Sequence, residues 1–253
     1  MARFEGKTAV VTGAGSGMGR EVAEQLAAEG AKVIAVDLQF PDFSPDDDEK
    51  EKGPIIRRKQ DVTVAEEWDA LALDLSRSGS SGVDILVNAA GVMDYAVLHE
   101  TELSSWRHTM AVDLDGVMLG MRALIPLMRR QGRGGSIVNF SSVLASVALA
   151  GSPAYHAAKA AVTQLTRNAA VTYASDNIRV NAIEPGIIAT PMVLRQPNEF
   201  NQAVVSHTPL GRMGTPREIA KCVLFMASDD AAFMTGSAVV VDGGFSVGAL
   251  DSR

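Results

Sequence analysis

The chain has 253 residues, 47% of them hydrophobic, and carries 23 basic against 30 acidic side chains, which gives a net charge of −7. This acidic balance argues against binding to nucleic acid or to an acidic membrane, because both attract a basic surface. Cys222 is the only cysteine, so an intrachain disulfide and a cysteine-based zinc site are excluded. No positively charged leader opens the sequence and no apolar run reaches the roughly 18 residues of a membrane span, so we expect a cytoplasmic protein.

Short β-branched runs alternate with longer helical patterns along the whole chain. The predicted strands are Thr8–Thr12, Lys32–Asp37, Asp84–Asn88, Ser136–Phe140, Arg179–Ile183 and Ala238–Val241. Most of them are almost continuously apolar, as parallel strands buried on both faces are. The alternation predicts an α/β fold, in which residues 1–253 form a single Rossmann-type domain with a doubly wound parallel sheet and helices on both faces.

A glycine-rich turn, VTGAGSGMGR, follows the first strand and leads into a helix predicted over Met18–Glu29. The free N–H groups and partial positive charge of a helix N-terminus attract phosphate, and glycine lets the backbone approach it closely. A glycine-rich turn alone is weak evidence, but its place between a strand and an amphipathic helix favours a dinucleotide site. The candidate binding residues here are Gly13, Ser16, Gly17, Met18 and Gly19.

Asp37 ends the second predicted strand, 24 residues beyond Gly13. An acidic residue at this place accepts hydrogen bonds from the adenosine ribose hydroxyls, although a solvated aspartate at a strand end is a common alternative. A carboxylate repels a 2′-phosphate, and neither Ser16 nor Leu38 offers a cation to hold one. We therefore expect NAD rather than NADP, unless a lysine or arginine from elsewhere reaches the site.

Two other segments carry local signals. Phe40–Gly53 reads FPDFSPDDDEKEKG and is predicted to be an exposed loop, because the sheet pattern resumes after it. Thr215 to Glu218 have the spacing of a capping box with proline at the first helical position, which predicts a helix to about Ser228 with Cys222 on or near its buried side.

Tyr155 and Lys159 lie four residues apart at the start of a helix predicted to run to about Ser175. Residues at this spacing project from one helix face, so the phenol and the ammonium share a pocket. Such a pair occurs often by chance. Ser141 and Ser142 make it more specific, because they end a predicted strand at the sheet edge where ligands bind.

With these motifs in order, the chain resembles the short-chain dehydrogenase/reductase family over essentially its whole length. Thr12–Gly19 resembles the family's cofactor loop, and Ser142 stands thirteen residues before Tyr155, at the family's usual catalytic spacing. The remaining similar segments are Asp61-Val62 (the adenine-contacting pair), Asn88-Ala89-Ala90-Gly91 (the Asn-Asn-Ala-Gly motif, with Ala89 in place of the second asparagine) and Pro185-Gly186 with Ile188 and Thr190 (the nicotinamide carboxamide segment).

The resemblance implies that Tyr155 exchanges a proton with the substrate oxygen while a hydride moves to or from nicotinamide. Ser142 would orient that oxygen, and Lys159 would also bind the cofactor ribose. A cation ~4 Å from the phenol at an effective dielectric constant of ~20 contributes at most roughly 4 kcal/mol, enough to lower a pKa of ~10 by about three. We therefore expect Lys159 to lower the pKa of the Tyr155 phenol to near neutral pH.

A second departure matters for the chemistry: Asp113 stands where the family usually has asparagine, which holds a water that leads to the lysine. Aspartate has the same backbone carbonyl as asparagine, so we expect the proton relay through that carbonyl to persist. A carboxylate at this place either pairs with Lys159 and weakens its pull on Tyr155, or points elsewhere. We expect an active enzyme with a shifted pH dependence.

The segment 189–214 resembles the family's substrate lid. The candidate pocket residues, beside Ser142 and Tyr155, are Met93, Leu144, Leu149, Ile187, Met192 and Val193. They are mostly apolar and offer no cation for a carboxylate or phosphate, so we expect a hydrophobic secondary alcohol or ketone, cyclic or steroid-sized compounds included.

Two alternatives remain open at this point. The first is reduction of a 3-oxoacyl thioester on an acidic carrier protein, with Arg129, Arg130 and Arg133 as a basic patch, although a solvated helix end explains these arginines equally well. The second is a dinucleotide-binding sensor or structural subunit, which only Asp113 supports. His99, His108, His156 and His207 are dispersed, and no metal is expected. The resemblance also implies a homotetramer paired through helices over Trp106–Arg130 and Tyr155–Ser175.

Overall fold

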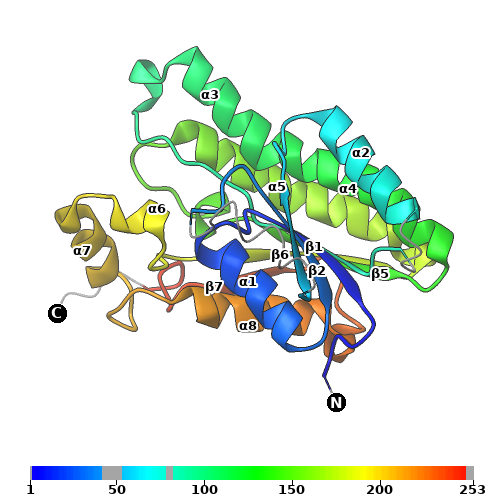
Figure 1. The fold of residues 1–253 in the computed structure, drawn as a ribbon. Helices are drawn as coiled ribbons and strands as arrows, with labels where there is room; N and C mark the ends of the chain where they lie inside the picture. Colours follow the sequence, from blue (N-terminus) through cyan, green and yellow to red (C-terminus); the bar gives the residue numbers. More distant parts are fainter. Residues whose placement is uncertain (1, 42–52, 78–81, 249–253) are drawn as a thin grey trace.

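The structure is a computed structural model that describes residues 2–41, 53–77 and 82–248. At its centre lies a parallel sheet with the strand order β3-β2-β1-β4-β5-β6-β7 (Figure 1). The order reverses between β1 and β4, which is the switch point of a doubly wound, Rossmann-type sheet. The strands are β1 (Thr8–Thr12), β2 (Lys32–Asp37), β3 (Ile55–Lys59), β4 (Ile85–Asn88), β5 (Gly135–Phe140), β6 (Ile178–Pro185) and β7 (Ala238–Val241).

All six predicted strands are present, with ends that shift by at most two residues. The sequence analysis missed β3, which reads IIRRK. This strand lies at the edge of the sheet and pairs only with β2, so it needs few apolar residues and shows no continuous hydrophobic run. Most of the loop predicted over Phe40–Gly53 lies outside the described residues.

Eight α-helices are assigned within the described residues, and none of them combines the length and apolarity that crossing a bilayer requires. Figure 1 shows α1 and α8 together on one face of the sheet, with α2, α4 and α5 on the other. The helices are α1 (Gly17–Ala28), α2 (Ala65–Arg77), α3 (Leu103–Met110), α4 (Gly116–Gln131), α5 (Pro153–Tyr173), α6 (Pro191–Leu194), α7 (Asn198–Ser206) and α8 (Pro216–Ala227).

Each face of the sheet has its own hydrophobic core. Leu26 of α1 and Leu224 of α8 are fully buried on one face. Trp68 of α2, Leu124 of α4 and Ile137 of β5 are fully buried on the other. The sheet is therefore covered on both sides, which explains the nearly continuous apolar runs of its central strands.

One turn of π-helix, Ala111–Asp115, joins α3 to α4. The sequence analysis predicts a single helix over Trp106–Arg130, and the backbone is indeed helical throughout, but it is widened at this turn. Widened turns of this kind occur often at functional sites. Here the turn contains Asp113.

The C-terminal helix α8 begins as predicted. Thr215 caps it, and the Thr215 and Glu218 side chains form the reciprocal capping box with Pro216 in the first turn. Cys222 is partly buried against the core, and burial raises the pKa of its thiol. A protonated thiol in this position fits the structural role that the sequence predicts.

Two leucines of α2 give a matched test of the packing on the sheet face that α2, α4 and α5 cover. Leu71 is 2% exposed and Leu73 is 46% exposed. We expect Leu71→Ala to lower the free energy of unfolding by about 2–5 kcal/mol, because it leaves a cavity. Leu73→Ala, the same change on the solvent side, should alter it by no more than about 0.5 kcal/mol. Urea titrations followed by circular dichroism measure both, and equal effects would contradict the packing described here.

Candidate active site

The site lies at the carboxyl edge of the sheet, where β1, β4, β5 and β6 end. Two hollows meet there. One, of about 1110 Å³, runs along the glycine-rich turn and the ends of β2 and β4. The other, of about 820 Å³, lies beyond the end of β5 and beneath α6 and α7. Met18, Thr190 and Met192 line both, so the two hollows adjoin.

The glycine-rich turn leaves the N-terminus of α1 open towards the first hollow. Ser16 is extended and makes no side-chain cap, and the first turn carries no acidic residue. Gly13 has φ +65°, and a Cβ there would lie 2.7 Å from the Ala89 carbonyl oxygen. A Cβ at Gly19 would lie 2.3 Å from the Gly13 carbonyl oxygen. Uncapped N–H groups on a backbone that tolerates no side chain fit a pyrophosphate.

Asp37 fixes this turn to the end of β2. Its carboxylate accepts hydrogen bonds from the backbone N–H groups of Gly15 at 2.8 Å and Gln39 at 3.1 Å. Both Asp37 and Leu38 line the first hollow. A carboxylate has about four lone-pair sites, so acceptor capacity remains for ribose hydroxyls.

Most of the predicted coenzyme residues line the first hollow. They are Gly13, Ser16, Gly17, Met18, Gly19, Asp37, Leu38, Asp61, Val62, Ala89, Gly91 and Thr190. Gln60, Thr63, Ala90, Val92, His108, Val112 and Pro191 line it as well and were missed. The missed residues flank the recognised motifs or come from α3 and the π-turn, whose approach depends on tertiary packing.

Six of the predicted coenzyme residues do not line the first hollow: Tyr155 and Lys159, described below, and Asn88, Pro185, Gly186 and Ile188. Asn88 is 2% exposed, and its amide donates to the Oδ1 atom of Asn139 at 2.8 Å beneath the site. Thr12, at the end of β1, joins that strand to the end of β4. Its hydroxyl accepts hydrogen bonds from the backbone N–H groups of Ala89 and Ala90. Pro185, Gly186 and Ile188 line the second hollow rather than the first.

Ser142, Tyr155 and Lys159 lie together beside the second hollow, and Lys159 Nζ also lies close to Gly91, which lines the first hollow. Ser142 follows β5, and its hydroxyl accepts from the Leu144 backbone N–H at 3.1 Å. Lys159 Nζ lies 5.3 Å from the Tyr155 ring centroid and donates to the Phe140 carbonyl at 3.0 Å. Both Ser142 and Tyr155 line the second hollow.

Asp113 pairs with Lys159, one of the two arrangements that the sequence left open. Its Oδ2 atom lies 3.4 Å from Lys159 Nζ, and its Oδ1 atom accepts from the Val92 backbone N–H at 2.7 Å. The Asp113 side chain is fully buried, and burial raises the pKa of its carboxyl against the opposing charge of Lys159. Burial lowers the pKa of Lys159, but the charges of Asp113 and Tyr155 outweigh it and raise that pKa overall.

The phenol of Tyr155 does not behave as the sequence analysis expected. Burial raises its pKa above the ordinary value of 10, and the charge of Asp113 raises it further, against the opposing effects of Lys159 and Ser142. The expectation that Lys159 alone lowers the pKa of the phenol to near neutral pH is therefore wrong for this structure. The simple Coulomb argument left out burial and the carboxylate on the far side of the ammonium.

All eight predicted substrate-pocket residues line the second hollow, including Met93, Leu144, Leu149, Ile187, Met192 and Val193. Tyr95, Val143, Gln196, Phe200, Val204 and Phe245 also line it and were missed. Tyr95 was within reach of the sequence argument, because it stands two residues after Met93. Phe245 was not, because only the tertiary fold returns the C-terminal segment to this pocket.

His156 is directed away from the reacting groups. Its Nδ1 atom lies 2.8 Å from the Ser152 carbonyl, and its Nε2 atom accepts from the Leu149 backbone N–H at 3.2 Å. The imidazole therefore fixes the loop that carries Leu149, which is a packing role. No group of three or more histidine, cysteine, aspartate or glutamate side chains suited to a metal ion occurs among the described residues.

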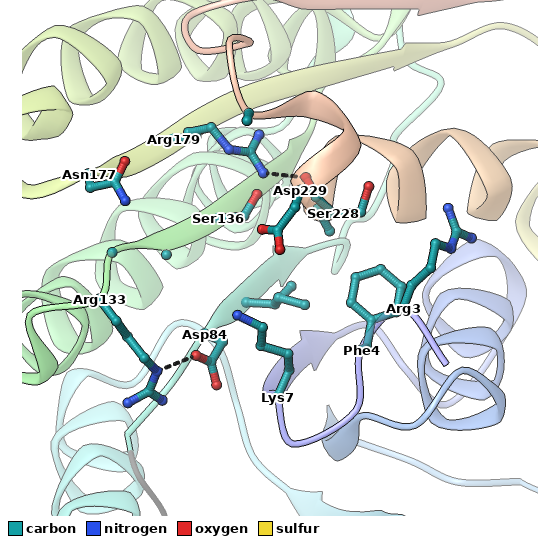
Figure 2. A pocket seen from close by; sticks show the side chains of 15 residues that line it. Arg3, Phe4, Lys7, Asp84, Arg133, Ser136, Asn177, Arg179, Ser228 and Asp229 are labelled. Carbon is teal, nitrogen blue, oxygen red and sulfur yellow. Dashed lines mark hydrogen bonds and ion pairs between the residues drawn. The ribbon is translucent and has the colours of Figure 1, made fainter. Parts of the chain in front are cut away.

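Another hollow, of about 620 Å³, opens at the opposite edge of the sheet (Figure 2). Three cations of its lining, Arg3, Arg133 and Arg179, already have partners, Arg3 with Glu29. Arg133 Nε lies 2.8 Å from Asp84 Oδ1, and Arg179 donates to the carbonyl oxygens of Met226, Ser228 and Met234. These contacts join β4, β5 and β6 to the end of α8, so we assign this hollow a structural role.

The chain is similar over nearly its whole length to known proteins. Residues 13–246 match the family described as enoyl-(acyl carrier protein) reductase. The cis-4-hydroxycyclohexanecarboxylate dehydrogenase of Sinomonas cyclohexanicum is 39% identical over 248 residues, covering 96% of this chain and 98% of that one. The galactitol 2-dehydrogenase (L-tagatose-forming) of Cereibacter sphaeroides is 39% identical over 249 residues, covering 97% of each. The ligand-free structure of Thermoplasma acidophilum aldohexose dehydrogenase has a TM-score of 0.89 at 32% identity, covering 100% of this chain and 98% of that one.

Proposed function

The chain belongs to the short-chain dehydrogenase/reductase family, and on this premise we propose that it is an NAD(H)-dependent enzyme that interconverts a hydrophobic secondary alcohol, cyclic ones included, and its ketone. One observation carries the proposal. Ser142 and Tyr155 line the mainly apolar second hollow, and Lys159 lies beside Tyr155 and close to Gly91, which lines the adjoining hollow along the glycine-rich turn.

The residues around the first hollow fit NAD. The open N-terminus of α1 would bind the pyrophosphate, Asp37 the adenosine ribose, and Asp61 with Val62 the adenine. Lys159 would bind the nicotinamide ribose, and Thr190 lies where the two hollows adjoin, near the expected position of the carboxamide. The bound coenzyme supplies or accepts the hydride.

Tyr155 would carry the proton transfer. In the oxidative direction its phenolate takes the hydroxyl proton of the alcohol, while the carbinol hydrogen leaves with its electron pair as a hydride and a carbonyl remains. In the reductive direction the phenol donates the proton to the new alkoxide. The raised pKa of Tyr155 keeps the phenol protonated near neutral pH, which suits reduction. The positive charge of an oxidised nicotinamide nearby would favour the phenolate and so oxidation.

Ser142 and Lys159 would prepare this step. The Ser142 hydroxyl already accepts from Leu144 and retains its own proton to donate to the substrate oxygen. Lys159 is held on two sides, by the Phe140 carbonyl and by Asp113. Its ammonium therefore stays charged and fixed beside Tyr155, where it favours the phenolate.

The carrier-protein reading has less support. Its basic patch is partly neutralised within the chain, since Arg129 pairs with Asp176 and Arg133 with Asp84, both at 2.8 Å. The description of the matching family is its main argument. The reading as a sensor without catalysis is opposed by the assembled Ser142, Tyr155 and Lys159.

We also propose a homotetramer. Val171 of α5 and Phe225 of α8 are 83% and 45% exposed, and Phe233 is fully exposed. Val240, which is 46% exposed, lies in β7, an edge strand of the described sheet. Apolar residues and an unpaired strand edge of this kind favour contacts between subunits. The cytoplasmic location stays a prediction from the sequence.

Replacing Tyr155 by phenylalanine removes only the hydroxyl that moves the proton. We expect Tyr155→Phe to lower kcat for alcohol oxidation by at least about 10²-fold, as expected for loss of a general acid–base group. NADH affinity, measured by fluorescence titration, should change by less than about threefold. Turnover within tenfold of the wild type would remove Tyr155 from the mechanism.

Asp37 gives a test of coenzyme choice. We expect kcat/KM for NADH to exceed that for NADPH by at least about tenfold, because the carboxylate repels the 2′-phosphate. Asp37→Asn should narrow the preference, since the amide keeps an acceptor oxygen for the Gly15 N–H but loses the charge. Steady-state assays with both coenzymes measure this, and equal or better efficiency of the wild type with NADPH would refute it.

Asp113 gives a test of the pH dependence. Its charge raises the pKa values of both Tyr155 and Lys159. In Asp113→Asn both values should fall, so the profile of log kcat/KM for alcohol oxidation should move to lower pH on both limbs. The two profiles should converge in acid, where the wild-type carboxyl is itself protonated. A profile identical to that of the wild type would show that the carboxylate does not act on the phenol.

A further inference from the structure

The second hollow has a polar pair that the reaction does not use. Tyr95 follows β4, and Gln196 lies just after α6 in the segment expected to form the lid. Both side chains line the hollow, and the nearby Gln196 amide opposes the burial that raises the pKa of the Tyr95 phenol. The two residues come from opposite sides of the pocket, one from the sheet edge and one from the lid.

The other polar side chains that line this hollow already have partners or belong to the reacting end. The hydroxyl of Ser141 donates to the Lys159 carbonyl at 2.9 Å and contacts Thr163 at 2.8 Å. Thr190 caps α6 by accepting from Val193. Ser142 and Tyr155 face the reacting oxygen. The hydrogen-bonding capacity left for the rest of a substrate is therefore that of Tyr95 and Gln196.

The position of Tyr95 relative to Tyr155 is fixed by the backbone. Ser152, which precedes α5, donates through its N–H to the Ala96 carbonyl at 3.0 Å and through its hydroxyl to the Asp94 carbonyl. The two bonds flank Tyr95 and join its segment to the helix that carries Tyr155. Tyr95 and Tyr155 both line this hollow, and the charge of Tyr155 adds to the burial that raises the pKa of Tyr95.

Among the residues that the structure describes, none that lines this hollow has a charged side chain. A phenol and a primary amide can each donate and accept a hydrogen bond, and they match a neutral hydroxyl or carbonyl better than an anion. A site that binds a substrate hydroxyl discriminates strongly against the analogue that lacks it, because its polar groups are then left unpaired.

We propose that Tyr95 and Gln196 form a specificity-determining pair that selects cyclic secondary alcohols or ketones bearing a second, neutral oxygen across the ring from the reacting carbon. The inference rests on the proposed dehydrogenase function and narrows its substrate class. It places one oxygen of the substrate at Ser142 and Tyr155, and the other between the sheet edge and the lid.

The experiment compares two ring substrates of similar size, 1,4-cyclohexanediol and 4-methylcyclohexanol, with NAD⁺ as the oxidant and each as separated cis and trans isomers. The wild type should favour the better diol isomer by at least about tenfold in kcat/KM. Tyr95→Phe and Gln196→Met should each lower the diol value at least about tenfold and change the methyl compound less than about threefold. Tyr173→Phe, a tyrosine change outside the pocket, should alter neither.

The outcomes separate the two proposals. Turnover of both alcohols by the wild type without a diol preference, or an equal loss on both in Tyr95→Phe, overturns the polar pair and leaves the dehydrogenase standing. A clear preference for 4-hydroxycyclohexanecarboxylate over the diol also overturns it, in favour of an anionic substrate. If no alcohol is oxidised, the proposed function fails. Ligand-observed NMR of 4-hydroxycyclohexanone and 4-methylcyclohexanone then tests the role of Tyr95 and Gln196. Tyr95→Phe should weaken binding of the hydroxylated ligand only, and equal effects on both ligands would overturn the pair.

Discussion

A buried charge pair holds the reacting end of the molecule together. Lys159 is 3% exposed and Asp113 is 0% exposed, so neither charge is solvated by bulk water. Such charges are tolerated only when they compensate each other and their remaining hydrogen-bonding capacity is met. The Phe140 carbonyl and the Val92 N–H help to meet it, and they tie α5 and the π-turn to the ends of β4 and β5. Removing either charge would leave the other buried and unpaired.

The same pair sets the electrostatics around Tyr155. Lys159 favours the phenolate, whereas the Asp113 charge and burial oppose it, and the balance in this structure keeps the phenol protonated. With asparagine in place of Asp113 the lysine would act on the phenol without a counter-charge. The Asp113 carboxylate therefore lowers the driving force for removing the proton of Tyr155. It also keeps the Lys159 ammonium charged and in place. Added positive charge from an oxidised coenzyme would restore that driving force, which couples proton transfer to the coenzyme's redox state.

The reaction and the choice of substrate depend on different parts of the fold. The reacting groups are attached to strand ends and the first turns of long helices, so packing on both faces of the sheet fixes their positions. The substrate pocket is closed by α6, α7 and Phe245, whose contacts with the sheet are fewer. Relatives with about the same identity are named for a cyclohexane acid and for a sugar alcohol. Whole-chain similarity therefore does not identify the substrate, and we propose that pocket residues such as Tyr95 and Gln196 carry that information.

The sequence by itself determined the sheet, the glycine-rich turn and the reacting set. Apolar periodicity and the Tyr155–Lys159 spacing are local, and the physics that they reflect acts over a few residues. Local patterns failed where position was decided by distant contacts. They missed the edge strand β3, whose position at the sheet edge allowed three consecutive cations, and they placed Asn88 in the coenzyme site, whereas its amide donates to Asn139 on the neighbouring strand. Only the tertiary structure decided that Asp113 faces Lys159, that burial raises the pKa of Tyr155, and that Gln196 and Tyr95 line the same hollow. Each of these depends on which side chains the packed helices and the lid bring together and on how much water they exclude.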